Sequence, residues 1–284
     1  MKFSSLIFSL LLFLINPALA QKDLPTQGIN ENSFILGIVD KIQSAELGEN
    51  RVLNIYLPEG YSSDSAITYP VIYLLDGSAN EDFIHIGGLV QFLTMIKAMP
   101  ASIVVGIANI DRRRDFTFPT GIAEDKKDYP TTGSSAKFIA FIEKELQPFV
   151  ERKYKTNNSK TIIGQSLGGL LATEILLKEP GLFNNYIIVS PSLWWNNESL
   201  LSDAPKLLEN QSANAIKVYI SVGTEGKQME DDAKKLAEIL ETFGKKNLNI
   251  SFLSLPNESH LTILHNSVYK GFEILYPKKI TEVK

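Results

Sequence analysis

The chain has 284 residues, of which 44% are hydrophobic and 21% charged, with a formal net charge of −4. This balance provides no basic excess, which argues against nucleic acid or an anionic membrane surface as a partner. The chain contains no cysteine, which excludes disulfides, thiolate metal sites and a cysteine nucleophile. Its length is within reach of one large α/β domain.

The first twenty residues have the pattern of a secretory signal peptide. Lys2 supplies a positive charge, residues 6–15 are apolar, and Ala18-Leu19-Ala20 forms a small-x-small cleavage site. The apolar stretch is shorter than the roughly 20 residues of a membrane-spanning helix. We expect cleavage after Ala20, a periplasmic or secreted protein with no membrane association after cleavage, and one domain over residues 21–284. The alternative is an uncleaved N-terminal anchor.

The pattern along the rest of the chain alternates between strands and helices. Residues 33–45 and 51–57, joined by the turn-like ELGEN, indicate an antiparallel hairpin. Continuous apolar runs, typical of strands buried on both faces, follow at 71–75, 103–108, 161–163, 186–189, 218–222 and 250–255. Helical patterns lie at 83–98, 134–153, 167–178, 227–245 and 267–275. This alternation predicts an α/β fold with a mostly parallel central sheet and helices on both faces.

Packing alone does not explain the glycines in the sequence of residues 161–177, TIIGQSLGGLLATEILL. Three glycines surround Ser166, although glycine adds backbone entropy to be lost and no side chain to pack. The sequence Gly164-Gln165-Ser166-Leu167-Gly168 fits G-x-S-x-G with a strand before and a helix after, the context of a nucleophile elbow. The alternative is a helix N-cap serine beside packing glycines.

A serine nucleophile needs a base, and in this arrangement the chain order is serine, acid, histidine. Of the three histidines, His260 and His265 follow Ser166. We favour His260, because it lies in a loop after a predicted strand, where ligands meet parallel sheets. His265 is in an apolar stretch typical of a helix.

The acid is expected in the loop after the preceding strand. Glu225 stands between two glycines just past that strand, a place from which a carboxylate can hold an imidazole N–H. Asp231 and Asp232 are alternatives, although acidic residues are also common in the first turn of a helix. Asp76 precedes the serine, so we expect it to hold a loop rather than act as the acid.

Two backbone amides are candidates for an oxyanion hole. The Leu167 N–H lies at the start of the helix after Ser166, and the Ser78 N–H lies in the turn after the strand VIYLLDG.

Side chains near the predicted strand ends are candidates for substrate binding. In DRRRD, residues 111–115, Arg112 or Arg114 could face the cleft and recognise an anionic or catecholic group, although a solvated loop or an internal Arg–Asp pair is equally compatible with the pattern. Trp194 and Trp195 could stack on rings or pack in the core. His85, near the predicted oxyanion loop, could line the site or be a satisfied structural histidine.

Six motifs in one order carry a resemblance over nearly all of the chain after residue 20: YLPEGY, YPVIYLLDG, IVVGIANIDRRRDFTFPT, GQSLGGLLA, SPSLWW and ESHLTILHNSVYKGF. The chain resembles the esterase family of α/β hydrolases that contains esterase D and the enterobactin-type siderophore esterases. The resemblance implies an α/β-hydrolase fold without a separate cap domain, a triad of Ser166, Glu225 and His260, and an oxyanion hole from Leu167 and Ser78.

The sequence therefore predicts an exported serine carboxylesterase that hydrolyses a small-molecule ester through an acyl-enzyme, with a catecholate siderophore ester as a candidate substrate. Alternatives are a carbohydrate or lipid ester hydrolase, an acyltransferase of the same fold, or a non-catalytic binding protein. We expect no cofactor, and no metal, because the separated histidines offer no ligand cluster. The sequence does not determine the oligomeric state.

Overall fold

The structure is a computed structural model that describes residues 35–210 and 214–277. The elements below belong to the unit that begins at Leu36. The predicted signal peptide, its cleavage site and the first residues of the predicted domain lie outside the described residues. Within the described ranges, no helix has the length and apolar character needed to cross a membrane.

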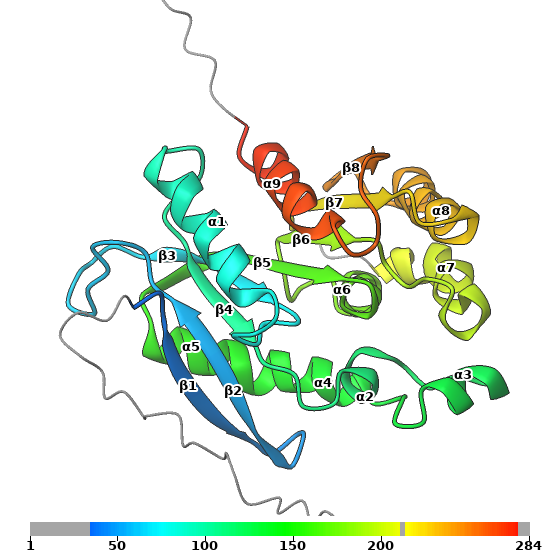
Figure 1. Ribbon diagram of the computed structural model, residues 1–284, viewed down its shortest axis with the longest axis horizontal. Coiled ribbons are helices and arrows are strands. Elements are labelled where there is room, and N and C mark those ends of the chain that lie inside the picture. Colours follow the sequence, from blue (N-terminus) through cyan, green and yellow to red (C-terminus); the bar gives the residue numbers. More distant parts are fainter. Residues whose placement is uncertain (1–34, 211–213, 278–284) are drawn as a thin grey trace, which may run out of the picture. The chain divides into compact units, whose positions relative to one another are not determined.

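The described strands form one sheet of eight, in the order β1-β2-β4-β3-β5-β6-β7-β8 (Figure 1). The hairpin of β1 (Ile38–Ser44) and β2 (Glu49–Tyr56) is antiparallel, and β2 also pairs antiparallel with β4. All other neighbours are parallel. The remaining strands are β3 (Tyr69–Leu74), β4 (Ile103–Ile107), β5 (Thr156–Gln165), β6 (Asn185–Val189), β7 (Ile216–Gly223) and β8 (Leu248–Leu255). The predicted mostly parallel α/β fold with an N-terminal antiparallel hairpin is confirmed.

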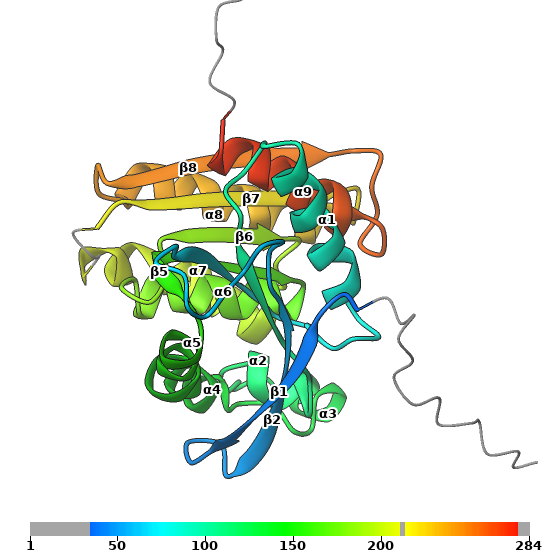
Figure 2. The same ribbon diagram turned by 90° about the vertical axis from the view of Figure 1, so that its left-hand side faces the viewer.

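Helices cover both faces of this sheet (Figures 1 and 2). One face is covered by α1 (Phe83–Met95) and α9 (Ile263–Leu275). The other is covered by α4 (Ser135–Phe141), α5 (Gln147–Lys153), α6 (Leu167–Lys178), α7 (Trp195–Leu207) and α8 (Lys227–Phe243). The central strands are therefore shielded from water on both sides, as their unbroken apolar sequences predict.

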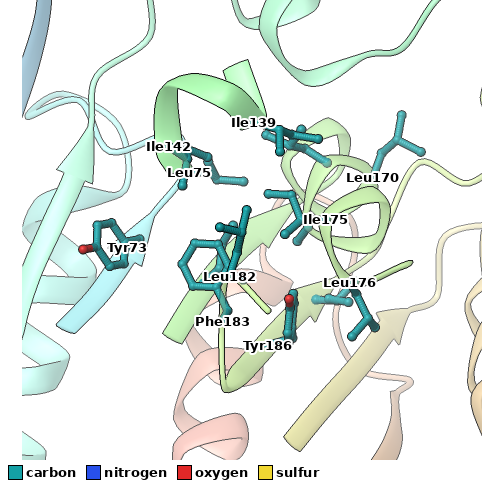
Figure 3. Close-up of a cluster of buried hydrophobic side chains, with 14 of the residues drawn as sticks. Tyr73, Leu75, Ile139, Ile142, Leu170, Ile175, Leu176, Leu182, Phe183 and Tyr186 are labelled. Atoms are coloured by element: carbon teal, nitrogen blue, oxygen red, sulfur yellow. The ribbon is translucent and has the colours of Figure 1, made fainter. Parts of the chain in front are cut away.

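The core is two apolar layers, one on each face of the sheet. In β3 and the residue after it, Tyr73 and Leu75 belong to the layer under α4 and α6, whereas Ile72 and Leu74 belong to the layer under α1 and α9. Figure 3 shows part of the first layer, which includes Ile175 of α6 and Phe183, whose ring centroid lies 5.6 Å from that of Tyr73. Because each buried aliphatic side chain contributes about 1.5–3 kcal/mol, these layers dominate the stability of a chain without disulfides.

The structure differs from the sequence-based expectations in several helices. Residues 134–153 are not one uniform helix, because a π-helical segment, Ile142–Leu146, separates α4 from α5. Pro148 has no N–H to donate one turn back, and its ring crowds the preceding turn, which favours this wider geometry. The last helix, α9, begins four residues earlier than expected.

Three further helices have no clear apolar period in the sequence and were not expected. They are α2 (Arg112–Phe116), α3 (Ala123–Asp128) and α7. In α7, the residues Asn196, Asn197 and Glu198 have positive φ angles of 50°, 54° and 57°. Such conformations favour asparagine over most other residues, and they interrupt the helical spacing near the start of α7.

The close approach of β5 to α6 requires a residue without a side chain at position 164, and this requirement can be tested. A Cβ atom at this position would lie 2.3 Å from the Gly168 carbonyl oxygen. We expect Gly164→Ala to lower the midpoint of thermal unfolding by roughly 5 °C or more, because α6 must shift. Gly88→Ala, in α1, is the matched control, since a Cβ there meets nothing within 4 Å and alanine favours helix. Equal midpoints for both variants would show that α6 does not press on β5.

Candidate active site

Ser166 lies in the sharp turn between β5 and α6, at the carboxyl edge of the sheet. Its φ of 58° and ψ of −119° are unusual for a residue with a side chain. Its N–H donates to the Val189 carbonyl of neighbouring β6 (3.1 Å). A Cβ on Gly169 would lie 2.9 Å from the Pro191 Cα atom. The strand-turn-helix geometry expected of a nucleophile elbow is thus present.

His260 and Glu225 meet at the same edge of the sheet, each in a loop that follows a parallel strand. Glu225 follows β7 and His260 follows β8. The imidazole Nδ1 atom lies 2.6 Å from Glu225 Oε2. The His260 carbonyl accepts a hydrogen bond from Gln165 Nε2 (2.5 Å), which joins the histidine loop to the residue before Ser166.

The Glu225 carboxylate is buried and held by several donors. Its side chain is only 2% exposed. Besides His260, Oε1 accepts from the Ser190 hydroxyl (2.5 Å) and from the Gly223 N–H (2.9 Å). Burial acts to raise the pKa of Glu225, but the hydrogen bonds from His260, Ser190 and Gly223 outweigh it and hold the pKa below its usual value. The carboxylate is therefore ionised at neutral pH and can hold a proton on the imidazole.

Ser166 and His260 line one pocket of about 530 Å³. Its other lining residues are Tyr129, Ser192, Trp194, Thr224, Glu225, Met229, Ser259 and Leu261. The Ser166 Oγ atom lies 3.2 Å from Ser192 Oγ. Among the hydrogen bonds of the described residues, the Ser166 hydroxyl is paired with Ser192 and not with His260. The candidate nucleophile and the candidate base therefore line the same pocket.

The two candidate oxyanion amides belong to different segments, the start of α6 and the loop after β3. Leu167 is the first residue of α6, so its N–H has no carbonyl one turn back to bond to. Ser78 lies in the loop after β3, where its hydroxyl accepts from the Asn109 N–H (3.2 Å). The preceding Gly77 is fixed from two sides, by its N–H to the Ile107 carbonyl (3.0 Å) and by Asn54 Nδ2 to its own carbonyl (2.8 Å). The Ser78 loop is thus anchored to β2 and β4.

Arg112 ties the Ser78 loop to the Ser166 turn. Its Nε and Nη2 atoms donate to the two carboxylate oxygens of Asp76 (2.6 and 2.9 Å), and Nη2 also donates to the Gln165 carbonyl (3.2 Å). Burial acts to lower the pKa of Arg112, but the hydrogen bonds and charge of Asp76 outweigh it and raise that pKa. The expected structural role of Asp76 agrees with this ion pair. Substrate binding by Arg112 stays a prediction.

The other two arginines of the DRRRD stretch point elsewhere. Arg114 donates to Glu49 (2.6 Å) and Asp115 (2.8 Å), and it is not a lining residue of the pocket. Arg113, which the sequence did not single out, lies over the ring of Tyr129, with the guanidinium carbon 4.9 Å from the ring centroid. Consecutive residues of a short helix face different directions, so Arg113 comes nearer to the pocket wall than Arg114.

The two tryptophans have different environments. Trp195 is fully buried, and its Nε1 atom donates to the Phe118 carbonyl (2.9 Å). Trp194 lines the pocket, and its ring centroid lies 6.0 Å from that of Tyr129. Stacking on a substrate is therefore open to Trp194, whereas Trp195 packs in the core.

His85 does not line the pocket of Ser166. Its ring packs edge to face against that of His265, with centroids 4.4 Å apart, and joins α1 to α9. Burial and the nearby charge of His85 lower the pKa of His265. The pairing places both histidines away from the candidate nucleophile, in agreement with the choice of His260.

Sequence reasoning missed six of the lining residues: Tyr129, Ser192, Thr224, Met229, Ser259 and Leu261. Ser192 follows β6, the neighbour of β5 in the sheet, so its place after a strand was an available signal. Tyr129 ends α3, an unexpected helix, and no local pattern marks it.

Comparison with known proteins identifies the family. Residues 44–260 match the Esterase family model, described as "Putative esterase". The chain belongs to this esterase family. The predicted family and the predicted enzyme class, carboxylic ester hydrolase, are confirmed.

Three relatives illustrate the similarity. The esterase is 29% identical to the ferri-bacillibactin esterase BesA of Bacillus subtilis over 264 residues, which cover 84% of this chain and 90% of that one. It resembles the structure of an IroE-like serine hydrolase from Shewanella oneidensis, with a TM-score of 0.77, 30% identity, and coverage of 84% and 80%. It also resembles the BES protein from Bacillus cereus, with a TM-score of 0.76, 30% identity, and coverage of 88% and 100%.

Neither alternative acid of the esterase contacts His260. Asp231 is exposed in α8 and pairs with Lys227 on the same helix. Asp232 is buried, and burial together with the charge of Glu198 raises its pKa to about 6. In residues 35–210 and 214–277, no group of three or more potential ligands is arranged to hold a metal ion.

A pair of matched substitutions distinguishes Glu225 from Asp231. We expect Glu225→Gln to lower kcat about 10³-fold or more, because it removes the charge that holds the His260 tautomer. Asp231→Asn should change kcat less than about twofold, since exposed ion pairs contribute little. Steady-state hydrolysis of a p-nitrophenyl ester measures both, and the reverse ranking would assign the acid to Asp231.

The same variant has a pH signature in stability. Because the folded state lowers the pKa of Glu225, its contribution to stability is present above the unfolded pKa, about 4.3, and is lost as the pH falls through the lower folded value. Glu225→Gln should therefore lose less stability than wild type on acidification below about pH 4.5, as measured by urea unfolding.

Proposed function

We propose that this protein is an exported serine esterase in which Ser166, His260 and Glu225 form the catalytic triad. The observation that carries the proposal is the pairing of the buried Glu225 carboxylate with His260, in a pocket that Ser166 also lines. The pair supplies an oriented base, and the sharp turn places the partly exposed Ser166 hydroxyl at the start of helix α6.

The reaction begins with attack of Ser166 Oγ on the ester carbonyl carbon. His260 Nε2 accepts the serine proton while Nδ1–H stays bonded to Glu225, whose charge stabilises the imidazolium. The Leu167 and Ser78 amides donate to the carbonyl oxygen as it becomes negative. His260 then protonates the departing alcohol, which leaves an acyl-enzyme. Water, deprotonated by His260, attacks the acyl carbon and releases the acid and free Ser166.

The substrate we propose is an ester that carries aromatic rings, of the siderophore type. One relative is named as a ferri-bacillibactin esterase, and the pocket offers the ring faces of Trp194 and Tyr129 for stacking. Leu261, directly after His260, is 93% exposed and provides apolar surface at the mouth. A pocket of about 530 Å³ accepts a ring with its linker.

The charges around this pocket favour a substrate of low net charge. None of the described lining residues is lysine or arginine. The guanidinium of Arg113 lies over the ring of the lining residue Tyr129, while Arg112 and Arg114 are engaged with carboxylates. A ferric catecholate complex carries net negative charge, whereas its iron-free ester is close to neutral. We therefore expect the iron-free form to be the better substrate.

Hydrolysis assays test the reaction and the substrate together. The protein starting at Gln21 should cleave a short p-nitrophenyl ester and an iron-free catecholate siderophore ester, and it should cleave the ferric complex more slowly. Ser166→Ala should lower each rate by several powers of ten without changing the far-ultraviolet circular dichroism, because the nucleophile is lost.

The possible outcomes separate the two parts of this proposal. Activity within tenfold of wild type in Ser166→Ala would remove Ser166 from its role. Serine-dependent cleavage of the small ester alone would retain the triad and reject the siderophore. Faster cleavage of the ferric complex would reject the charge argument, and Arg113→Met would then test whether that guanidinium is responsible.

Export is the remaining part of the proposal and rests on the pattern of the first twenty residues. Expressed with its full N-terminus in a Gram-negative host, the protein should appear in the periplasmic fraction with an intact mass that begins at Gln21. Ala20→Leu, which replaces the small residue before the cleavage site, should accumulate as the longer precursor. A wild-type mass that retains Met1 in the periplasmic or membrane fraction would contradict cleavage.

A further inference from the structure

The turn after β6, Ser190-Pro191-Ser192, contacts both ends of the proposed triad. The Ser190 hydroxyl donates to Glu225 (2.5 Å), and the Ser192 hydroxyl lies 3.2 Å from that of Ser166. In the sheet, β6 lies between β5 and β7. Its terminal turn therefore sits between the nucleophile and the loop of the acid, at the edge where reacting groups gather.

We propose that Ser192 is a further catalytic residue, whose hydroxyl donates a hydrogen bond to Ser166 Oγ while that oxygen attacks the substrate and later leaves it. The inference rests on the proposed esterase function and adds a residue to it.

The Ser192 hydroxyl is held in place by its surroundings. Ser192 is 2% exposed, and its N–H donates to the Ser166 carbonyl (3.0 Å). The turn is fixed at its start, where Ser190 has a φ of 43° and its N–H donates to the Ser221 carbonyl (2.8 Å). Pro191 has a ring-restricted φ. A donor that is fixed before the reaction costs no reorganisation when charge develops.

The two hydroxyls share one contact, so the direction of the hydrogen bond decides its effect. If Ser166 donates to Ser192, its proton points away from the base. If Ser192 donates, the Ser166 proton is free to pass to His260 Nε2. In the described residues, the hydrogen-bond partner of the Ser192 hydroxyl is Ser166. The Ser192 proton is therefore available for donation to Ser166 Oγ. Transfer of the Ser166 proton to His260 thus requires the second direction.

This hydrogen bond strengthens as the reaction proceeds. When the Ser166 proton moves to His260, Oγ acquires negative charge, and hydrogen bonds to charged acceptors are stronger than those to neutral ones. In deacylation, the bond between the acyl carbon and Oγ breaks, and the departing Oγ receives its proton from His260. Ser192 stabilises the same oxygen in both steps, and its hydrogen bond gains strength as that oxygen becomes charged in the transition state. Its loss should therefore lower kcat rather than raise KM.

The experiment compares Ser192→Ala with wild type in two reactions of the full chain. One is hydrolysis of p-nitrophenyl acetate. The other is inactivation by a fluorophosphonate, in which a bond forms between Ser166 Oγ and phosphorus while fluoride leaves. We expect kcat and the inactivation rate to fall about 10- to 100-fold, as for loss of a hydrogen bond to a charged group, with KM within threefold and an unchanged thermal midpoint.

A matched pair separates the hydroxyl from its packing. Ser192→Thr and Ser192→Val have nearly the same volume, but only threonine keeps the donor. The threonine variant should be at least tenfold faster than the valine variant in both reactions. If the added methyl group prevents the threonine and valine variants from folding, the alanine variant decides whether the hydroxyl is required. The measurement is then its rate of inactivation by the fluorophosphonate, which depends on Ser166 Oγ and not on ester binding.

Each result has a defined consequence. An alanine variant as fast as or faster than wild type overturns the proposal, since Ser192 would then be neutral or withhold the proton. Equal rates for the threonine and valine variants also overturn it, because the loss would come from packing. A wild-type protein that neither hydrolyses esters nor reacts with the fluorophosphonate would overturn the esterase function itself, which distinguishes that failure from the failure of Ser192 alone.

Discussion

The strained backbone of Ser166 is the constraint on which the site depends. A non-glycine residue in this conformation costs on the order of 1–3 kcal/mol, and it persists here because β5, α6 and β6 press on it from three sides. The strain lifts the hydroxyl out of the sheet at the carboxyl ends of the parallel strands. Since β6, β7 and β8 end at the same edge, the residues that follow them, Ser192, Glu225 and His260, reach the site without long excursions of the chain.

Ion pairs hold the loops that the sheet itself does not fix. Arg112 bridges Asp76, in the loop after β3, and the carbonyl of Gln165, the last residue of β5. A second network, in which Arg51 is fully buried against Asp115, anchors the same α2 segment to the hairpin. Breaking a buried pair leaves an uncompensated charge and is strongly destabilising. In the DRRRD stretch, which the sequence offered as a substrate-binding loop, Arg112 and Arg114 therefore have a structural role.

The sequence predicted what local pattern determines and missed what depends on distant partners. The strand-glycine-serine-helix pattern around Ser166 is local, and the place of His260 after a strand is set by the alternation of the fold. The direction of each arginine is not local, because it depends on acidic residues such as Glu49 and Asp76 far away in the chain. The environments of the two tryptophans also depend on distant residues. Trp195 is buried in the core, where the Phe118 carbonyl accepts a hydrogen bond from its indole N–H.

The walls of the pocket come from segments outside the strand-helix alternation. Tyr129 ends α3 and Trp194 precedes α7, two helices that no periodicity predicted. The left-handed turn at Asn196 joins them, because its side chain accepts from the Gly121 N–H (2.8 Å) and its N–H donates to Asp125 (3.1 Å). The candidate triad thus lies at the edge of the sheet, whereas Tyr129 and Trp194 of the pocket wall lie in two segments outside the sheet that Asn196 holds together. Such segments can change without disturbing the catalytic edge, which allows one fold to serve esters of different shape.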